Sequence, residues 1–379
     1  MQRVKVGVIG CGMISEIYLM NITNRFSNVL EAYACANRSD AAAEKRAEQF
    51  HIRKMTTEEL LADPEVDVVL DLTVPEAHYE INRKALLAGK HVYSEKPLAV
   101  ATEEAEELLA LAEECGLFVG SAPDTFLGGG LQTCRRLLDD GAIGNPVFAV
   151  GVMAAYGPEK FHPNPEFFYR RGAGPLFDMG PYYLTALQFL LGPARRVSGA
   201  GSRGEPVRRV LSEESPRRGA EFSCETDTTV CGTIEYENGA IASLTTSWEM
   251  EDVYWKSGLP CLTLFGTGGT LILPDPNTFG GIGSSPVDRP GTYVLLKQGK
   301  GSFRQVEIDP SEYLNNSRGL GLCDMGWFIR NGGTPRVSGR NAVHIVEIMN
   351  GILQSAEEGR YYELHTGCTR PELHYRDGK

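Results

Sequence analysis

The sequence lacks paired cysteines and long apolar runs. Its nine cysteines are odd in number and none belongs to a Cys-X-X-Cys pair, so neither a disulfide framework nor a zinc site is indicated. No run of about 18 apolar residues occurs, so we expect no membrane-spanning helix. The first residues show no charged region followed by a long apolar segment, so we expect no signal peptide. We therefore predict a cytoplasmic protein with free thiols and no metal.

Positive charge is also scarce. The chain has 37 lysines and arginines against 49 acidic residues, a net charge of −12. Such a surface repels nucleic acid and anionic membranes, so we expect neither as a partner. The length of 379 residues is too great for one ordinary core and favours two domains.

The first 120 or so residues alternate between apolar strands and helices. Strands are predicted at residues 4–9, 30–36, 66–72, 91–94 and 117–120, and helices at 41–50, 56–62, 76–88 and 102–115. This alternation is typical of an α/β fold: a Rossmann-type, doubly wound parallel sheet that binds ligands at the carboxyl ends of its strands. We place the boundary of this domain near residues 122–125, which gives domains 1–123 and 124–379.

The second domain has a different pattern. After a helix at 128–140, strands are predicted at residues 146–154, 228–236, 240–248, 260–265, 270–273, 293–297 and 303–308, and helices at 321–331 and 340–359. Turn residues separate the strands, which indicates an α+β domain with a large, mostly antiparallel sheet and one open face. Residues 204–222 carry four arginines among Glu, Ser and Pro. We interpret them as a solvated loop, with an anion-binding site as the alternative.

A glycine-rich loop follows the first strand. Residues 10–15 read GCGMIS, which has the form G-X-G-X-X-S. Gly10 permits the tight turn, and Gly12 lets the backbone approach a pyrophosphate at the start of a helix that Met13 and Ile14 lead into. Ser15 replaces the third glycine, where a small residue is needed for packing. The position after the strand makes a dinucleotide site the preferred interpretation over a simple glycine turn.

The end of the second strand bears on which dinucleotide is bound. NAD enzymes usually place an acidic residue there for the ribose 2′-hydroxyl. This chain has Asn37 followed by Arg38. The missing carboxylate removes repulsion against a 2′-phosphate, and Arg38 is able to pair with it. We therefore expect NAD(P), with NADP favoured slightly over NAD. The alternative is that Arg38 stacks on adenine or points into water.

Three further segments identify a family resemblance. They read TVPEAH at 73–78, SEKPLA at 94–99 and GPLFDMGPYY at 174–183. Together with the glycine loop they resemble the Gfo/Idh/MocA oxidoreductases, and the resemblance extends over essentially the whole chain. The Glu-Lys-Pro motif is the most specific part of it.

The resemblance implies roles for particular residues. Glu95, Lys96 and Pro97 would lie beside the nicotinamide, with Lys96 contacting cofactor and substrate. Thr73, Pro75 and His78 would line the cofactor cleft. In the second domain Asp178 and Tyr182 would face the substrate. Tyr182 stands where most of the family has histidine, which leaves the identity of the base open.

These residues suit alcohol oxidation, in which a base removes the hydroxyl proton while a hydride leaves carbon. An ammonium stabilises a nearby phenolate, so Lys96 would make Tyr182 a usable base, with Asp178 orienting the hydroxyl. Two alternatives remain open: Asp178 is only a helix N-cap, or Tyr183 is the functional ring.

A second candidate base is His162. It lies in a Pro-broken aromatic segment at residues 161–169, which would cover a sugar because sugars stack on aromatic faces. The alternative is an ordinary connecting loop.

The function expected from these residues is NAD(P)-dependent hydride transfer to or from a hydroxyl carbon of a sugar, sugar derivative or glycoside. One alternative is an NAD-dependent glycosidase that oxidises C3 transiently and eliminates the aglycone. Another is a non-catalytic dinucleotide-binding protein. The resemblance also suggests a homo-oligomer, a dimer, tetramer or higher assembly, formed through the open face of the second sheet.

Overall fold

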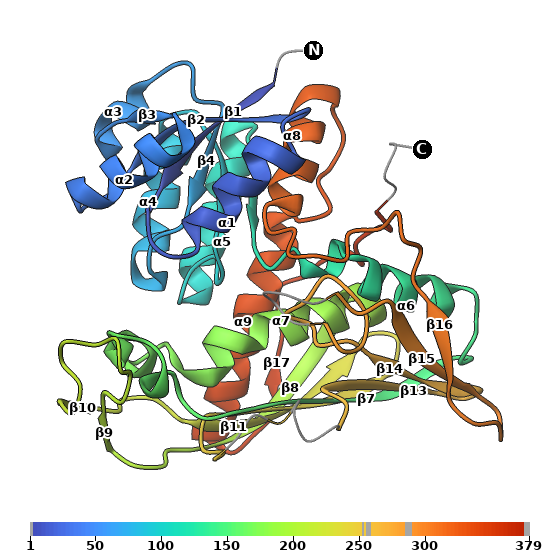
Figure 1. Ribbon diagram of the computed structural model, residues 1–379. Helices are drawn as coiled ribbons and strands as arrows, with labels where there is room; N and C mark the ends of the chain where they lie inside the picture. The colour runs from blue at the N-terminus through green and yellow to red at the C-terminus, as the bar shows by residue number, and fades with distance from the viewer. Residues whose placement is uncertain (1–2, 252–253, 255–258, 285–289, 375–379) are drawn as a thin grey trace. The chain divides into compact units, whose positions relative to one another are not determined.

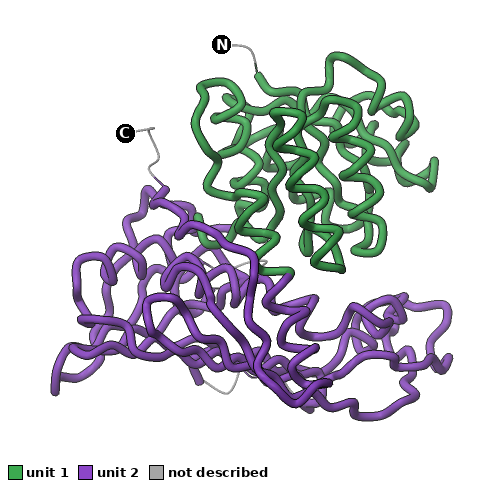
Figure 2. Tube along the Cα trace, turned by 180° about the vertical axis from the view of Figure 1, so that it is seen from behind, with its two compact units in different colours: residues 1–127, 316–346 green, residues 128–315, 347–379 purple. Residues whose placement is uncertain are grey.

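The computed structural model describes residues 3–251, 254, 259–284 and 290–374. It divides into two compact units, which Figure 2 colours separately. Unit 1 comprises Met1–Leu127 and Asn316–Val346, and unit 2 comprises Gly128–Asn315 and Glu347–Lys379. The predicted first domain was continuous, whereas compact unit 1 also takes in a segment from far along the chain.

Unit 1 is built on a parallel sheet whose buried apolar strands match the predicted alternation. In spatial order the strands are β3 (Arg53–Lys54), β2 (Leu30–Ala36), β1 (Val4–Ile9), β4 (Val68–Asp71), β5 (His91–Ser94) and β6 (Val119–Ser121). This order, with the strand sequence reversing direction beside β1, is that of a Rossmann-type sheet. The predicted fold class of the first domain is confirmed.

Helices connect these strands (Figure 1). They are α1 (Ser15–Met20) with the π-helical turn η1 (Asn21–Arg25), α2 (Asp40–Phe50), α3 (Thr57–Ala62), α4 (Pro75–Leu87) and α5 (Thr102–Cys115). Local sequence explains their ends. Thr56 and Glu59 form a capping box before α3, and α5 ends at Gly116 with φ 66°.

Helix α8 (Leu320–Asn331) belongs to unit 1 because tertiary contacts hold it there. The buried carboxylate of Asp124 accepts hydrogen bonds from the N–H groups of Gly319 (2.9 Å) and Gly321 (3.0 Å). Gly326 lets the helix approach closely, since a Cβ there would lie 2.7 Å from the Leu30 side chain. No periodic pattern in the sequence carries such long-range information.

Unit 2 is built on one large mixed sheet. In spatial order its strands are β16 (Arg304–Glu307), β15 (Tyr293–Gln298), β14 (Gly269–Leu273), β13 (Leu262–Gly266), β7 (Pro146–Ala154), β12 (Ile241–Ser247), β11 (Thr229–Tyr236), β8 (Ala194–Ser202) and β17 (Tyr362–Glu363). Strands β7 and β12 run parallel, and the other neighbouring pairs run antiparallel. The predicted large, mostly antiparallel sheet is confirmed.

One face of this sheet is covered by α6 (Gly129–Asp139), α7 (Gly174–Leu191) and the second half of α9 (Gly339–Glu358), as Figure 1 shows. Glycines allow the close packing: a Cβ on Gly232 would meet Ile352 of α9 at 2.7 Å. The opposite face leaves Phe148, Val150 and Ile241 exposed. None of the helices in the described ranges is long and apolar enough to cross a membrane.

The interpretation of residues 204–222 as a solvated loop is wrong at one point. Strands β9 (Val207–Arg209) and β10 (Glu221–Ser223) pair in a two-stranded antiparallel ribbon. Arg208 on this ribbon is buried, and its guanidinium pairs with Glu159 and Glu249. Carboxylates of the protein itself, distant in sequence, neutralise the arginine.

Candidate active site

Four sequence motifs meet at one edge of the unit 1 sheet. Strands β2, β1, β4 and β5 are neighbours, and their carboxyl ends lead into residues 37–38, 10–15, 73–78 and 95–97 respectively. The carboxyl edge of a doubly wound sheet, where the strand order reverses, is the place where dinucleotides bind. The structure therefore brings together all the predicted cofactor-binding segments.

The glycine loop has the shape that a pyrophosphate requires. Gly10 has φ 105°, and a Cβ there would lie 2.6 Å from the backbone of Leu72, so only glycine fits. A Cβ on Gly12 would meet nothing within 4 Å, so the space above it is open. Among the described residues, the N–H groups of Gly12, Met13 and Ile14 donate to no protein acceptor. These free donors fit a phosphate group.

Ser15 does more than fill the third position of the motif. Its hydroxyl donates to the carbonyl of Gly12 (2.6 Å) and accepts from Nε of Arg46 (3.0 Å). Arg46 comes from α2, is buried, and also pairs with Glu16 (2.9 Å) at the start of α1. The buried guanidinium of Arg46, which is not part of the sequence motif, therefore holds the glycine loop in place.

The end of β2 contributes two side chains with different roles. The Oδ1 atom of Asn37 accepts a hydrogen bond from the N–H of Cys11 (3.0 Å), so Asn37 holds the glycine loop. Arg38 is exposed and makes no hydrogen bond or ion pair within the part of the chain that the structure describes. Its guanidinium is therefore available to a ligand.

The Glu95-Lys96-Pro97 turn is anchored by buried groups. One carboxylate oxygen of Glu95 accepts from Tyr18 Oη (2.7 Å), and the other accepts from the N–H of Lys96 (3.0 Å). Tyr18 lies on α1 and is fully buried. Burial raises the pKa of Tyr18 well above its usual value, so the phenol keeps its proton and acts as a donor. This contact links the glycine-loop helix to the turn.

A second anchor connects the ends of β4 and β5. The imidazole of His78 is fully buried, with Nδ1 2.7 Å from the carbonyl of Pro97 and Nε2 3.1 Å from that of Thr73. Asp71 accepts hydrogen bonds from the N–H and hydroxyl of Thr73 (2.9 and 2.7 Å). Burial raises the pKa of Asp71. His78 therefore orients the two loops, and Thr73 and Pro75 are half-buried.

In unit 2, helix α7 carries the predicted substrate residues. Asp178 and Tyr182 are four residues apart, and therefore lie on the same face of the helix. The helix begins at Gly174 with Ala173 as its N-cap residue, so Asp178 is not an N-cap. The hydroxyl of Tyr183 is buried and donates to the carbonyl of Val152 (3.2 Å), which leaves Tyr182 as the candidate ring of the pair.

His162 lies close enough to Asp178 for the two to interact electrostatically. Burial lowers the pKa of His162, so the imidazole is neutral at neutral pH. Its Nδ1 accepts the N–H of Asn164 (3.1 Å), and a neutral imidazole with Nδ1 as acceptor carries its proton on Nε2. Nε2 of His162 is therefore a hydrogen-bond donor, which argues against its use as a base.

Sequence reasoning missed the residues that act through tertiary contacts. They are Tyr18, Arg46, Asp71, Asp124, Glu159 and Arg208. Burial raises the pKa of Asp124 to about 6. A carboxylate at the carboxyl end of a strand, as at Asp71, was a usable signal; the others had none. Within the described ranges, no group of three or more His, Cys, Asp or Glu side chains is placed to hold a metal ion.

The sheet order, the open glycine loop and the motifs at its edge define a dinucleotide-binding oxidoreductase fold. Residues 4–122 match the family described as "Oxidoreductase family, NAD-binding Rossmann fold", and residues 131–272 match the GFO/IDH/MocA C-terminal domain. The chain belongs to the Gfo/Idh/MocA family. It is therefore an oxidoreductase that uses a nicotinamide dinucleotide.

Among curated relatives, the chain is 26% identical over 318 residues to 1,5-anhydro-D-fructose reductase of Ensifer adhaerens, an alignment covering 82% of this chain and 84% of the relative. It is also 26% identical over 246 residues to D-xylose dehydrogenase of Paenarthrobacter nicotinovorans, covering 62% of this chain and 61% of the relative.

Solved structures share the fold over nearly the whole length. Levoglucosan dehydrogenase in complex with NADH has a TM-score of 0.81 at 18% identity, covering 96% of this chain and 100% of that one. The aldose-aldose oxidoreductase of Caulobacter crescentus, complexed with glycerol, has a TM-score of 0.77 at 20% identity with the same coverage. At such identities the likeness shows the fold alone.

Proposed function

We propose that this protein catalyses reversible oxidation of a hydroxyl carbon in a sugar, sugar derivative or glycoside. The observation that carries the proposal is the pair Asp178 and Tyr182 on one face of α7, with the N–H donor of His162 in the same electrostatic environment. These groups supply an acceptor, a phenol and a donor for adjacent sugar hydroxyls. The named activities of the relatives, on 1,5-anhydro-D-fructose and D-xylose, support the same substrate class.

The residues divide the chemistry between them. A bound nicotinamide supplies the hydride acceptor or donor. Tyr182 takes the proton from the reacting hydroxyl, and Lys96 contacts the cofactor and the substrate. Asp178 orients that hydroxyl, and His162 donates to a second one. Tyr18 and His78 act indirectly, because they hold the turn that carries Lys96.

For the cofactor, the proposal favours NADP over NAD. The backbone of Gly12, Met13 and Ile14 would bind the pyrophosphate, and Glu95 and Pro97 would flank the nicotinamide. The exposed, unpaired guanidinium of Arg38 suits a 2′-phosphate, and Asn37 presents no carboxylate to repel it.

We also propose that the open face of the unit 2 sheet buries itself against another copy of the chain, in a dimer, tetramer or higher oligomer. Phe148, which stacks on the half-buried Phe265 (ring centroids 4.3 Å apart), forms an exposed apolar surface with Val150 and Ile241. The nine cysteines are free, which suits the proposed cytoplasmic location.

The test is turnover with a panel of sugars and either nicotinamide cofactor, followed by variants. Lys96→Ala and Tyr182→Phe should each lower kcat by ~10²–10⁴, while the dissociation constant of the reduced cofactor, measured by fluorescence, changes little. Near-normal turnover in either variant would refute the role assigned to that residue.

The matched control is Tyr183→Phe. It removes the same atom from the adjacent tyrosine, whose hydroxyl bonds only to the protein interior. The expected result is unchanged kcat with a stability loss of about 1 kcal/mol. Absence of turnover with every sugar and both cofactors would contradict the proposed substrate class.

A further inference from the structure

The aromatic wall of unit 2 consists of His162, Phe167, Phe168 and Trp248. The rings of Phe167 and Phe168 stack with centroids 4.0 Å apart, and the His162 ring meets each of them edge-on at 5.3 Å. Phe168 in turn meets Trp248 at 6.1 Å. Three of these side chains lie on a short segment with little regular structure, η3 (Pro158–Lys160) and η4 (Pro165–Tyr169). The segment needs external support to keep one conformation.

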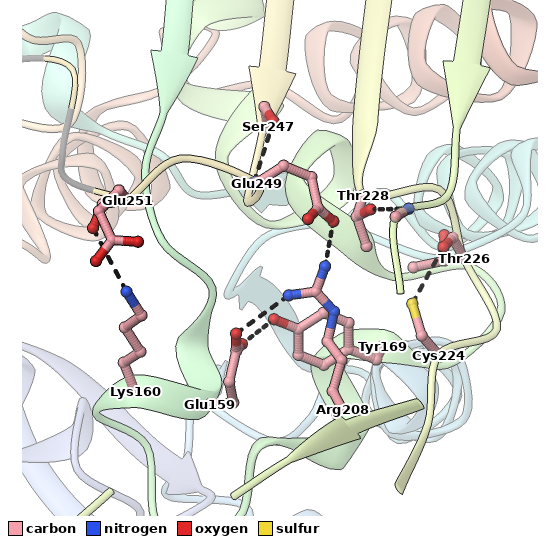
Figure 3. A network of polar contacts seen from close by, with 11 residues as sticks. Glu159, Lys160, Tyr169, Arg208, Cys224, Thr226, Thr228, Ser247, Glu249 and Glu251 are labelled. Carbon is pink, nitrogen blue, oxygen red and sulfur yellow. Dashed lines mark hydrogen bonds and ion pairs between the residues drawn. The ribbon is translucent and has the colours of Figure 1, made fainter. Parts of the chain in front are cut away.

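That support comes from a buried polar cluster, which Figure 3 shows. Arg208 of strand β9 bonds to Glu159 (3.1 Å) and to Glu249, and its guanidinium lies 5.0 Å from the ring centroid of Tyr169. Tyr169 donates its hydroxyl to Glu159. Glu159 and Tyr169 stand at the two ends of the segment that carries the wall, so one arginine holds both ends.

Backbone contacts extend the same support. The N–H groups of Leu211 and Ser212 donate to the carbonyl of Glu159 (2.8 and 3.0 Å). The hydroxyls of Ser212 and Ser215 donate to the carbonyls of Phe161 (3.0 Å) and Pro163 (2.6 Å), which flank His162. The segment that follows β9 therefore fixes the backbone on both sides of the histidine.

The charges explain why Arg208 matters most. Glu159 and Arg208 are both buried, whereas the other arginines paired in this region are exposed. Burial and the neighbouring Glu159 raise the pKa of Tyr169, so its phenol stays protonated and donates. Removing the guanidinium would leave the buried Glu159 without a cation, and the segment would have to move to hydrate it.

We propose that the β9–β10 ribbon, through Arg208, positions the aromatic wall and thereby sets the affinity of unit 2 for its sugar. This inference rests on the proposed function. Arg208 is a positioning residue: the half-buried Phe167, Phe168 and His162 are the part of the wall left accessible to a sugar, while Arg208 itself is buried.

The experiment compares Arg208→Met with Arg209→Met in the full-length protein. The two residues are adjacent on β9, but Arg209 is exposed and, among the residues that the structure describes, pairs only with the exposed Glu221. Arg208→Met should raise KM for the sugar about tenfold or more with kcat within about threefold and cofactor affinity unchanged. Arg209→Met should leave all three values unchanged. Equal KM values in the two variants would overturn the proposal.

Tyr169→Phe covers the case in which Arg208→Met fails to fold. It keeps the ring and removes only the hydroxyl bonded to Glu159, and a rise in KM of about threefold is expected; unchanged KM would overturn the proposal. Arg208→Lys restores one ammonium and should recover part of the affinity.

Tryptic cleavage after Arg170 or Arg171 gives a readout independent of turnover. Arg208→Met and Arg209→Met each lose one tryptic site, so their cleavage rates can be compared directly. We expect Arg208→Met to be cleaved faster than Arg209→Met. If wild type acts on no sugar, the proposed function fails, and faster cleavage still supports the positioning role. Equal cleavage rates would overturn it.

Discussion

The two units of this chain build their sites in different ways. In unit 1 the functional residues follow the ends of neighbouring parallel strands, so each short motif already specifies its place at the sheet edge. In unit 2 the wall depends on Glu159, Tyr169, Arg208 and Glu249, which come from three separate segments. A substitution in unit 1 should therefore act through local backbone geometry, and one in unit 2 through charge pairing at a distance.

The sharpest test of the local rule in unit 1 compares its two glycines. Gly10→Ala places a Cβ 2.6 Å from the Leu72 backbone at φ 105°, so we expect a stability loss of about 3 kcal/mol or more and loss of cofactor binding. Gly12→Ala meets no protein atom, so stability should hold while the dinucleotide dissociation constant rises about tenfold. Denaturation and fluorescence titration measure the two effects. Equal stability losses would contradict the comparison.

Asp124 is a residue of unit 1 that acts at a distance in sequence, like the unit 2 cluster. Burial raises its pKa from 3.8 to about 6. A raised carboxyl pKa means that the folded state binds the proton more tightly, so this stabilisation is present at low pH and is lost as pH rises through about 6. The shift corresponds to ~3 kcal/mol. Asp124→Asn removes this titration. As the pH rises from 4 to 7, the free energy of unfolding of the variant should therefore increase relative to that of wild type by about the same amount.

Urea unfolding at several pH values measures this difference, with Asp40→Asn, an exposed carboxylate, as the control. The free energies of unfolding of wild type and Asp124→Asn could instead differ by the same amount at every pH. That result would show that the N–H partners stabilise the buried carboxylate as well as water does.

The same contrast explains how much the sequence predicts. The strands of unit 1 and the motifs at the sheet edge are predicted from the sequence because periodicity and glycine chemistry are local. Residues 204–222 were misjudged because an arginine among Ser and Pro looks solvated until a buried Glu159 is found beside it. The placement of α8 was missed for the same reason: its partners Asp124 and Leu30 are about 200 and 290 residues away.

Ser15 and Arg46 offer a smaller effect inside unit 1. Ser15→Ala removes the bonds to the Gly12 carbonyl and to Arg46, so the dinucleotide dissociation constant should rise about fivefold, roughly 1 kcal/mol. Arg46→Ala should have a similar effect, and the double variant should cost less than the sum of both. Strict additivity would show that the two side chains act separately and that the loop is held by its backbone alone.

Arg38 should have the smallest effect on stability, because it is exposed and makes no hydrogen bond or ion pair with the residues that the structure describes. Arg38→Ala should weaken NADP about tenfold at low salt, less at high salt, and leave NAD unchanged. Asn37→Asp provides the complementary test, since its carboxylate still accepts from the Cys11 N–H and so preserves the loop while repelling a 2′-phosphate. Both variants should move the ratio of NADP to NAD affinity in the same direction without changing stability. Unchanged NADP affinity in Arg38→Ala would refute the assigned preference. A stability loss in Asn37→Asp would instead show that the loop also depends on the bond from Asn37 Nδ2 to the carbonyl of Ser39 (3.1 Å), which a carboxylate cannot make.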